Sequence, residues 1–191
     1  MHTEAGVSLD SYHFGGDEAK NILLKYDNYP SELKQRPFSK SPACEAKAQA
    51  EPSFNIEKIA NYWAGVVGKI LAEEGINEMV AWQDGLTGTT KGDYTTPSVA
   101  VNLWDTIFWG ATDTLVRESE AGFGIILSNP DFTYFDFPYE INVEERGYYW
   151  ASRANSMYKV FTFAPENLPQ NAETALNIQG NPYSVTTPEK P

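Results

Sequence analysis

The stretch of this sequence most suited to chemistry is residues 14–18, which read Phe-Gly-Gly-Asp-Glu. Asp17 and Glu18 follow an apolar-rich segment and precede a helix-compatible one, which is where α/β folds keep their reactive groups. The two glycines permit backbone conformations closed to other residues, so neighbouring carboxylates can face one cavity. Burial raises the pKa of a carboxyl group and solvation keeps its partner ionised, so such a pair can divide the work of proton transfer. The pair is a candidate acid–base site, and a solvated acidic turn is the alternative.

The elements that must position this pair are predicted to be strands and helices in the order strand, helix, strand, helix, strand, helix, strand. Strands are predicted over residues 7–14, 76–82, 98–104 and 123–128, and helices over residues 19–25, from residue 54 onward, and over 111–121. Ser53 is the expected cap of the second helix, and Gly75 and Gly122 are the expected stops. Near-continuous apolar strands separated by amphipathic helices indicate an α/β fold with a parallel sheet.

Three further segments are predicted to be irregular. Residues 26–52 contain several prolines and are expected to form a long excursion with at most short helical turns around residues 43–50. Residues 84–96 are a Gly- and Thr-rich loop. Beyond residue 129 an aromatic-rich segment, 134–150, leads to a helical turn near residues 151–157 and then to a polar tail.

Each predicted strand is followed by carboxylates, amides or aromatic residues: Asp17 and Glu18, then Trp82 and Asp84, then Asn102, Trp104 and Asp105, then Ser128, Tyr134 and Asp136. The carboxyl ends of parallel strands lie together, so these side chains are expected to converge. Aromatic faces pack on sugar rings while carboxylates bind the hydroxyls, a combination offered by Trp82, Trp104, Tyr134, Asp136 and Trp150. Taken singly, each tryptophan is more commonly a core residue. The agreement of four strand ends favours a sugar site.

The composition excludes several function classes. The chain of 191 residues has 14 Lys+Arg against 26 Asp+Glu, a formal net charge of −12 without a basic run, so a nucleic-acid partner is not expected. No apolar run approaches the roughly 20 residues of a membrane span, and the first residues lack the pattern of a signal peptide. Cys44 is the single cysteine and His2 and His13 are the two histidines, so neither an internal disulfide nor a metal or other cofactor is expected. The aromatic content of 14% favours a stacking function.

Several motifs extend these observations: His-Phe-Gly-Gly-Asp-Glu-Ala-Lys-Asn from His13, Ala-Trp-Gln-Asp-Gly from Ala81, Asn-Leu-Trp-Asp-Thr from Asn102, and Glu-Arg-Gly-Tyr-Tyr-Trp from Glu145. They resemble the bacterial chitobiases, which are β-N-acetylhexosaminidases of glycoside hydrolase family 20, and the resemblance covers nearly the whole chain. It implies a partial (β/α)₈ TIM barrel, with strands four to seven, their helices and long βα loops. Residues 1–191 would then be a single-domain fragment of the catalytic domain, an incomplete barrel.

The resemblance also implies a role for each site residue. Glu18 would be the general acid and then the base, and Asp17 would hold the N–H of the substrate's acetamido group, whose oxygen is the nucleophile. Tyr134 would bind the acetamido oxygen, Trp82 and Trp104 would wall its pocket, Asp136 would bind a sugar hydroxyl, and Trp150 would stack on the next sugar.

The implied reaction is the hydrolysis of terminal non-reducing β-linked N-acetylhexosamine residues from chitobiose, chitooligosaccharides and N-acetylglucosaminides, with retention. The resemblance implies a periplasmic or extracellular parent enzyme whose signal is not in this chain. The family pattern also needs an arginine on the first strand and a tryptophan and a glutamate on the eighth, which this chain does not supply. The expected consequences are reduced activity and self-association through exposed sheet edges.

Two other readings compete with this one. Gly-Gly-Asp-Glu is also the signature of diguanylate cyclases, but the residues around it differ here, with Ala19 in place of the phenylalanine that follows, and that family would leave the aromatic strand ends unexplained. The other alternative is a non-catalytic sugar-binding module or an inactive fragment. The presence of both Asp17 and Glu18 favours an enzyme, because binding alone needs no proton donor.

Overall fold

The computed structural model describes residues 4–19, 30–31, 36–148, 150–152 and 154–168. The chain divides into two compact units. The first unit contains residues 1–101 and 121–124, and the second contains residues 102–120 and 125–191. Each is described by itself below. No helix in the described ranges is long and apolar enough to cross a membrane.

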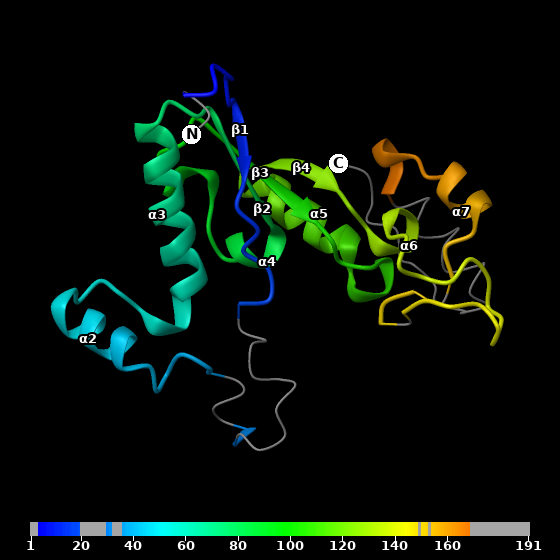
Figure 1. The fold of residues 1–191 in the computed structure, drawn as a ribbon, viewed down its shortest axis with the longest axis horizontal. Coiled ribbons are helices and arrows are strands. Elements are labelled where there is room, and N and C mark those ends of the chain that lie inside the picture. Colours follow the sequence, from blue (N-terminus) through cyan, green and yellow to red (C-terminus); the bar gives the residue numbers. More distant parts are fainter. Residues whose placement is uncertain (1–3, 20–29, 32–35, 149, 153, 169–191) are drawn as a thin grey trace. The chain divides into compact units, whose positions relative to one another are not determined.

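Four strands form one sheet in the order β1–β2–β3–β4 (Figure 1). They are β1 (Ser11–His13), β2 (Glu78–Trp82), β3 (Ser98–Leu103) and β4 (Gly124–Leu127). β1 pairs with β2 in parallel, with Tyr12 opposite Met79. The predicted α/β class with a parallel sheet is confirmed. β1 is shorter than predicted because its pairing with β2 begins only where the Asp10 carbonyl accepts the N–H groups of Asn77 and Glu78.

The long helix of the first unit is α3 (Ile59–Glu73), preceded by the 3₁₀-helix η1 (Ile56–Lys58). Its buried residues are Ala64, Val67, Gly68 and Leu71, at the spacing of one helical face. The predicted stop at Gly75 is confirmed, since Gly75 has φ 73° and the Ile76 N–H returns to the Leu71 carbonyl. The predicted cap is wrong, because Asn55 rather than Ser53 accepts a helix N–H, that of Glu57.

The rest of the first unit is less regular. Residues 43–50 belong to a full helix, α2 (Pro42–Ala50), longer than the predicted turns, with Ser41 as its cap and a proline at its start. The predicted loop after β2 contains the one-turn helix α4 (Gln83–Leu86) and the 3₁₀-helix η2 (Lys91–Asp93). The helix predicted over residues 19–25 lies outside the described residues apart from Ala19, which is in a turn.

The second unit contains α5 (Ala111–Glu120), as predicted, and the short helices η3 (Ile107–Trp109), α6 (Pro130–Thr133), α7 (Met157–Phe161) and η4 (Pro165–Asn167). Its core is formed by Ile107, Ala111, Phe132 and Leu168. The turn predicted near residues 151–157 is wrong. α7 begins where that turn was expected to end, because Ser156 caps it by accepting the Lys159 N–H.

Two charged side chains are buried in the second unit. Asp131 is 3% exposed and Lys159 is 1% exposed. Burial raises the pKa of Asp131, and the Ile107 N–H, which donates to its Oδ2 at 2.8 Å, opposes that shift. Burial also lowers the pKa of Lys159, opposed by the charge of Asp131. The Lys159 ammonium donates to the Ser152 hydroxyl at 3.3 Å and lies 5.6 Å from the centre of the Phe132 ring.

The buried ammonium makes stability depend on pH in the alkaline range. The native state releases the Lys159 proton at a lower pH than the unfolded state does, so stability should rise between the lowered pKa and the ordinary value of about 10.4. The difference between the thermal unfolding midpoints of the wild type and Lys159→Met should therefore shift in favour of the wild type as the pH is raised from neutral to alkaline. Lys69→Met removes an exposed ammonium and should run parallel to the wild type. Parallel curves for all three proteins would contradict the buried charge.

The sheet order leaves β1 and β4 at the edges, which predicts self-association of the 191-residue chain. The Asp10 carbonyl and the Phe14 N–H both face β2, so alternation points the Ser11 N–H at the open edge. Ser11→Pro should therefore weaken self-association in light scattering without loss of β1–β2 pairing. Tyr12→Pro is the control, since it removes an inward N–H and should destabilise the fold instead. A monodisperse wild-type monomer, or a Ser11→Pro chain that associates as strongly as the wild type, would refute this.

Candidate active site

The turn that carries Asp17 and Glu18 follows β1 directly and is wound in the left-handed region. Gly15 has φ 79°, Gly16 has φ 91° and Glu18 has φ 52°. A positive φ is uncommon for a residue with a side chain and costs on the order of 1 kcal/mol. Both carboxylates are exposed within the first unit. The turn therefore presents two adjacent acidic side chains on a backbone that the surrounding contacts must hold.

Main-chain hydrogen bonds tie this turn to β2. The Phe14 N–H donates to the Val80 carbonyl at 3.0 Å, and the Trp82 N–H donates to the Gly15 carbonyl at 2.9 Å. The Gly15 N–H donates to Nδ1 of His13 at 3.0 Å. The His13 ring also meets the half-buried Trp82 ring edge-on, with centroids 5.3 Å apart. These contacts bring the predicted site residue Trp82 beside the turn that carries Asp17 and Glu18.

The end of β2 approaches this turn closely through two glycines. A Cβ on Gly85 would lie 3.0 Å from the Gly16 carbonyl oxygen and 3.2 Å from its carbonyl carbon. A Cβ on Gly16 would lie 2.8 Å from the Phe14 ring. The close approach of the two backbones therefore depends on the missing side chain of Gly85, whereas a side chain on Gly16 would crowd Phe14.

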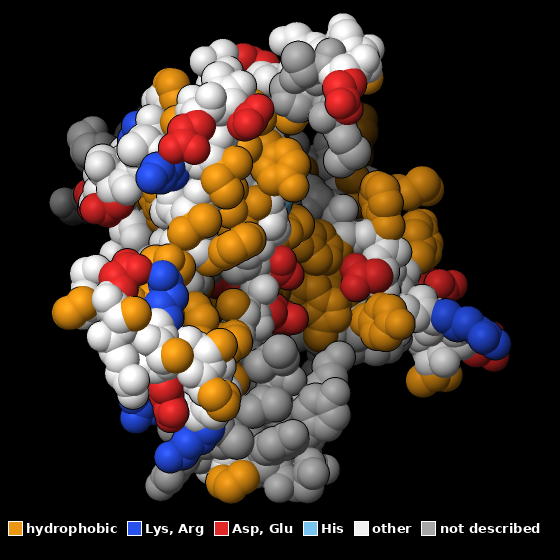
Figure 2. All heavy atoms as spheres, turned by 60° about the vertical axis from the view of Figure 1, so that its left-hand side comes forward, with side chains coloured by type: hydrophobic (Ala, Val, Ile, Leu, Met, Phe, Trp, Pro, Cys, Tyr) orange, Lys and Arg blue, Asp and Glu red, His pale blue; other side chains and the backbone are white. Residues whose placement is uncertain are grey.

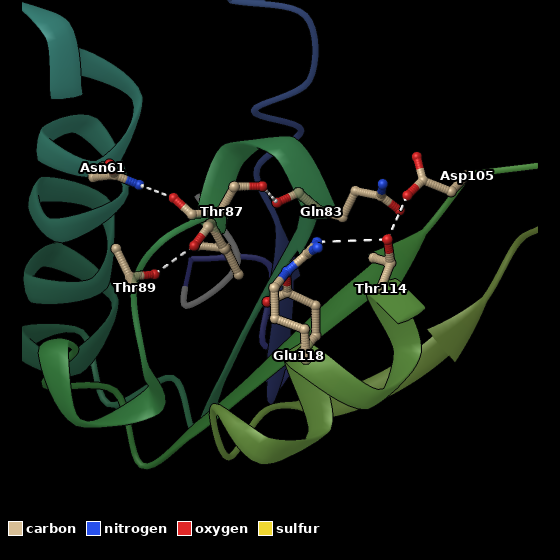
Figure 3. A network of polar contacts seen from close by, with 9 residues as sticks. Asn61, Gln83, Thr87, Thr89, Asp105, Thr114 and Glu118 are labelled. Carbon is tan, nitrogen blue, oxygen red and sulfur yellow. Dashed lines mark hydrogen bonds and ion pairs between the residues drawn. The ribbon is translucent and has the colours of Figure 1, made fainter. Parts of the chain in front are cut away.

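Beside Gly85, the half-buried Asp84 directly contacts the turn that carries Asp17 and Glu18. Its Oδ2 accepts the backbone N–H of Glu18. Asp84 lies in the first turn of α4, where Thr87 donates to the Gln83 carbonyl at 3.0 Å and Asn61 donates to the Thr87 carbonyl at 3.1 Å (Figure 3). Asp84 follows a predicted strand, but its partner lies 66 residues away in the sequence, so no local pattern indicated this contact.

An apolar cavity of about 390 Å³ opens beside the turn after β1. Gly16, Ala19 and Phe38 contribute to its wall, together with Cys44 from α2 and Trp63 from α3, and Cys44 is a free thiol. Figure 2 turns the side of α2 and α3 forward and shows hydrophobic side chains exposed there in several groups. Neither Asp17 nor Glu18 lines this cavity, so it lacks the mixture of acid and aromatic groups expected of a sugar site.

The second unit gathers the other predicted site residues in an aromatic cluster, defined as Trp104, Trp109, Tyr134, Phe137 and Trp150. The Trp150 ring lies at the centre, 5.9 Å from Trp104, 5.6 Å from Tyr134, 5.8 Å from Trp109 and 5.3 Å from Phe137, measured between centroids. Its indole N–H donates to Oδ2 of the exposed Asp136 at 3.1 Å. The structure thus brings Trp104, Tyr134, Asp136 and Trp150 together.

Trp109 and Phe137 are members of the cluster that the sequence analysis missed. For Phe137 the available signal was the high aromatic content of the segment after residue 129. Trp109 lies in the 3₁₀-helix before α5 and does not directly follow a predicted strand, so the strand-end pattern did not indicate it. None of the five tryptophans is buried: Trp63 is 55% exposed, Trp109 48% and Trp150 40%, and Trp82 and Trp104 are half-buried. The alternative that each tryptophan is a core residue is therefore not supported.

Polar contacts fix the loop that carries the cluster. The Asn155 amide donates to the Pro130 carbonyl at 2.5 Å and to the Tyr134 carbonyl at 2.9 Å, and the Tyr148 N–H donates to the Asp136 carbonyl at 2.8 Å. These bonds hold both ends of the segment between α6 and α7.

Side-chain hydrogen bonds join the ends of β3 and β4. Ser128 donates to Asn102 Oδ1 at 2.6 Å, and the Asn129 amide donates to the Asp105 carbonyl at 2.8 Å. Thr114 on α5 donates to Asp105 Oδ2 at 2.6 Å (Figure 3). The polar residues predicted at the ends of these strands therefore hold the loops that follow β3 and β4 to each other and to α5.

Comparison with known proteins gives a consistent family. The family model described as glycosyl hydrolase family 20, catalytic domain, matches residues 4–186. N,N'-diacetylchitobiase of Vibrio harveyi is 41% identical over 199 residues, which cover 96% of this chain and 22% of that protein. Beta-hexosaminidase of Vibrio vulnificus is 35% identical over 197 residues, which cover 100% of this chain and 21% of that protein.

Two further similarities are weaker. Beta-hexosaminidase B of Pseudoalteromonas piscicida is 35% identical over 183 residues, 96% of this chain and 21% of that protein. The structure of the GH20 beta-N-acetylhexosaminidase from Streptomyces coelicolor A3(2) superimposes with a TM-score of 0.49 at 19% identity, over 90% of this chain and 27% of that chain. The chain spans about a fifth of the length of the curated relatives that it matches.

Proposed function

Since the chain belongs to glycosyl hydrolase family 20, we propose that it supplies the acid–base part of a β-N-acetylhexosaminidase. The substrates are terminal non-reducing β-linked N-acetylhexosamine residues of chitobiose and chitooligosaccharides. The observation that carries the proposal is the left-handed turn that holds Asp17 and Glu18 at the end of β1, beside Trp82 at the end of β2. The relatives named as a chitobiase and as hexosaminidases support the substrate class.

The proposed mechanism uses the substrate's own acetamido group. The acetamido oxygen attacks the anomeric carbon, the glycosidic C–O bond breaks, and the leaving oxygen takes a proton from Glu18. Asp17 accepts the acetamido N–H and offsets the positive charge of the oxazolinium ion that forms. Water then attacks the same carbon while Glu18 takes up its proton, and the ring nucleophile leaves. Two inversions at one carbon give net retention.

The aromatic cluster is proposed as the sugar platform. Trp104 would wall the acetamido pocket, and Tyr134 would donate to the acetamido oxygen. Asp136 holds the Trp150 indole with one carboxylate oxygen, and its other oxygen has the capacity to accept a sugar hydroxyl. Trp150, fixed in this way and 40% exposed, would stack on the next sugar along the chain.

We further propose that residues 1–191 are strands four to seven of a (β/α)₈ barrel with their helices and long loops. The sequential order of the parallel sheet and the fifth of the relatives' length that the chain spans support this. A periplasmic or extracellular location belongs to the same proposal.

A sugar-binding role without turnover is the second candidate function, favoured by the exposure of the Asp17 and Glu18 carboxylates. Turnover of chitobiose compared with its binding by calorimetry separates the two.

The role of Glu18 is tested by Glu18→Gln in the protein at its natural full length. This change removes the proton donor, so kcat for aryl N-acetylglucosaminides with poor leaving groups should fall by about 10²–10⁴-fold, with activated aryl glycosides partly spared. Asp17→Asn should lower kcat for both kinds of substrate, because the Asp17 carboxylate is proposed to stabilise the charged intermediate. Glu78→Gln, an exchange of the same kind on β2, is the control. Cleavage of chitobiose by Glu18→Gln at the wild-type rate would exclude Glu18 as the acid.

Substrate assistance is tested by changing the sugar. Aryl β-glucosides lack the 2-acetamido nucleophile, so their kcat/KM should be orders of magnitude below that of the matching N-acetylglucosaminides. A thiazoline that mimics the cyclised intermediate should bind more tightly than the substrate, as transition-state-like ligands do. Comparable rates on glucosides and N-acetylglucosaminides would rule the mechanism out.

A further inference from the structure

We propose that Asp84 is a positioning residue for the general acid, which it holds by accepting the backbone N–H of Glu18. This inference rests on the proposed function and adds to it a residue that acts through Glu18 rather than on the sugar. The observation behind it is the hydrogen bond from the Glu18 N–H to Oδ2 of Asp84, across two strand ends of the first unit.

Asp84 is itself held firmly on its own side of this contact. It lies in α4 between Gln83, which is 6% exposed, and Leu86, which is fully buried. Thr87 and Thr89 donate back to the carbonyls of Gln83 and Leu86, at 3.0 Å and 2.6 Å. The carboxylate of Asp84 is therefore a fixed acceptor on a packed helical turn, whereas Glu18 is an exposed residue on a loop.

The two glycines set the distance between these partners. A Cβ on Gly85 would crowd the Gly16 carbonyl, so the two backbones approach closely next to Asp84 and two residues before Glu18. A side chain at Gly85 would press against that carbonyl. The contact between Asp84 and Glu18 thus depends on a backbone approach that a single methyl group disturbs.

The backbone of Glu18 explains why an acceptor is needed there. Glu18 has φ 52°, a conformation that a residue with a Cβ leaves unless other contacts hold it. A side-chain oxygen that accepts the Glu18 N–H contributes a hydrogen bond that holds this conformation. Without that acceptor the peptide relaxes toward negative φ and swings the Glu18 side chain away from the scissile oxygen. A displacement of about 1 Å at a reacting group costs about 10²-fold in rate.

The test compares Asp84→Ala with Asp84→Asn in the protein at its natural full length. Asp84→Ala removes the acceptor, so kcat for a poor leaving group should fall by about 10²-fold, the loss should be smaller for an activated aryl glycoside, and KM should stay the same. Asp84→Asn keeps an oxygen that can accept the N–H, so it should recover most of the loss. Gly85→Ala should reproduce the pattern of Asp84→Ala.

Asp93 provides the matched control, because its carboxylate also accepts a backbone N–H in the first unit, that of Thr90 at 2.7 Å. Asp93→Ala should leave kcat and its leaving-group dependence unchanged. Wild-type kinetics in Asp84→Ala would overturn the inference. So would an equal loss in Asp84→Asn and Asp84→Ala in proteins with a wild-type thermal midpoint, since the charge and not the acceptor would then matter. A wild type that hydrolyses neither substrate, or an unaffected Glu18→Gln, would instead overturn the proposed function.

Discussion

The contact between the backbones of Gly16 and Gly85 is the constraint on which the candidate active site depends. It brings the turn after β1 against the turn after β2 so closely that a Cβ on Gly85 would lie 3.0 Å from the Gly16 carbonyl oxygen. The hydrogen bond from Trp82 to Gly15 and the acceptance of the Glu18 N–H by Asp84 both lie next to this contact. These bonds help to hold Glu18 in its left-handed conformation, so the position of the proposed acid depends on the missing Cβ of Gly85.

The aromatic cluster of the second unit follows a different principle. Its rings are held by polar contacts of the loop backbone, through Asn155 and Asp136, more than by burial in the core. Trp109 and Trp150 remain 48% and 40% exposed, although large exposed rings are unfavourable in water. Exposed apolar surface that is fixed in place is typical of a binding face. Asp131 and Lys159 are buried in this unit, at 3% and 1% exposed, in contrast to these tryptophans.

Much of the fold could be predicted from the sequence because it depends on local signals. Apolar runs located all four strands, and Gly75 and Gly122 marked the ends of two helices. The errors arose where the contact that decided the outcome left no trace in the apolar pattern. β1 is short because its pairing with β2 begins only at the Asp10 carbonyl, and α7 begins late because Ser156 supplies its cap. The site residues could be grouped by the strand ends that they follow. The contact of Asp84 could not be predicted, because its partner is the backbone N–H of Glu18, 66 residues away in the sequence.

The central claim is that the turn after β1 presents the acid of a substrate-assisted glycosidase and that Asp84 holds it from behind. A crystal structure of the protein at its natural full length with the thiazoline mimic tests this most directly. The account predicts Asp17 within hydrogen-bond distance of the thiazoline nitrogen, Glu18 beside the anomeric carbon, and Asp84 bonded to the Glu18 N–H without touching the sugar. A sugar bound in the apolar cavity beside α2 and α3, or one contacted by Asp84 in place of Glu18, would contradict it.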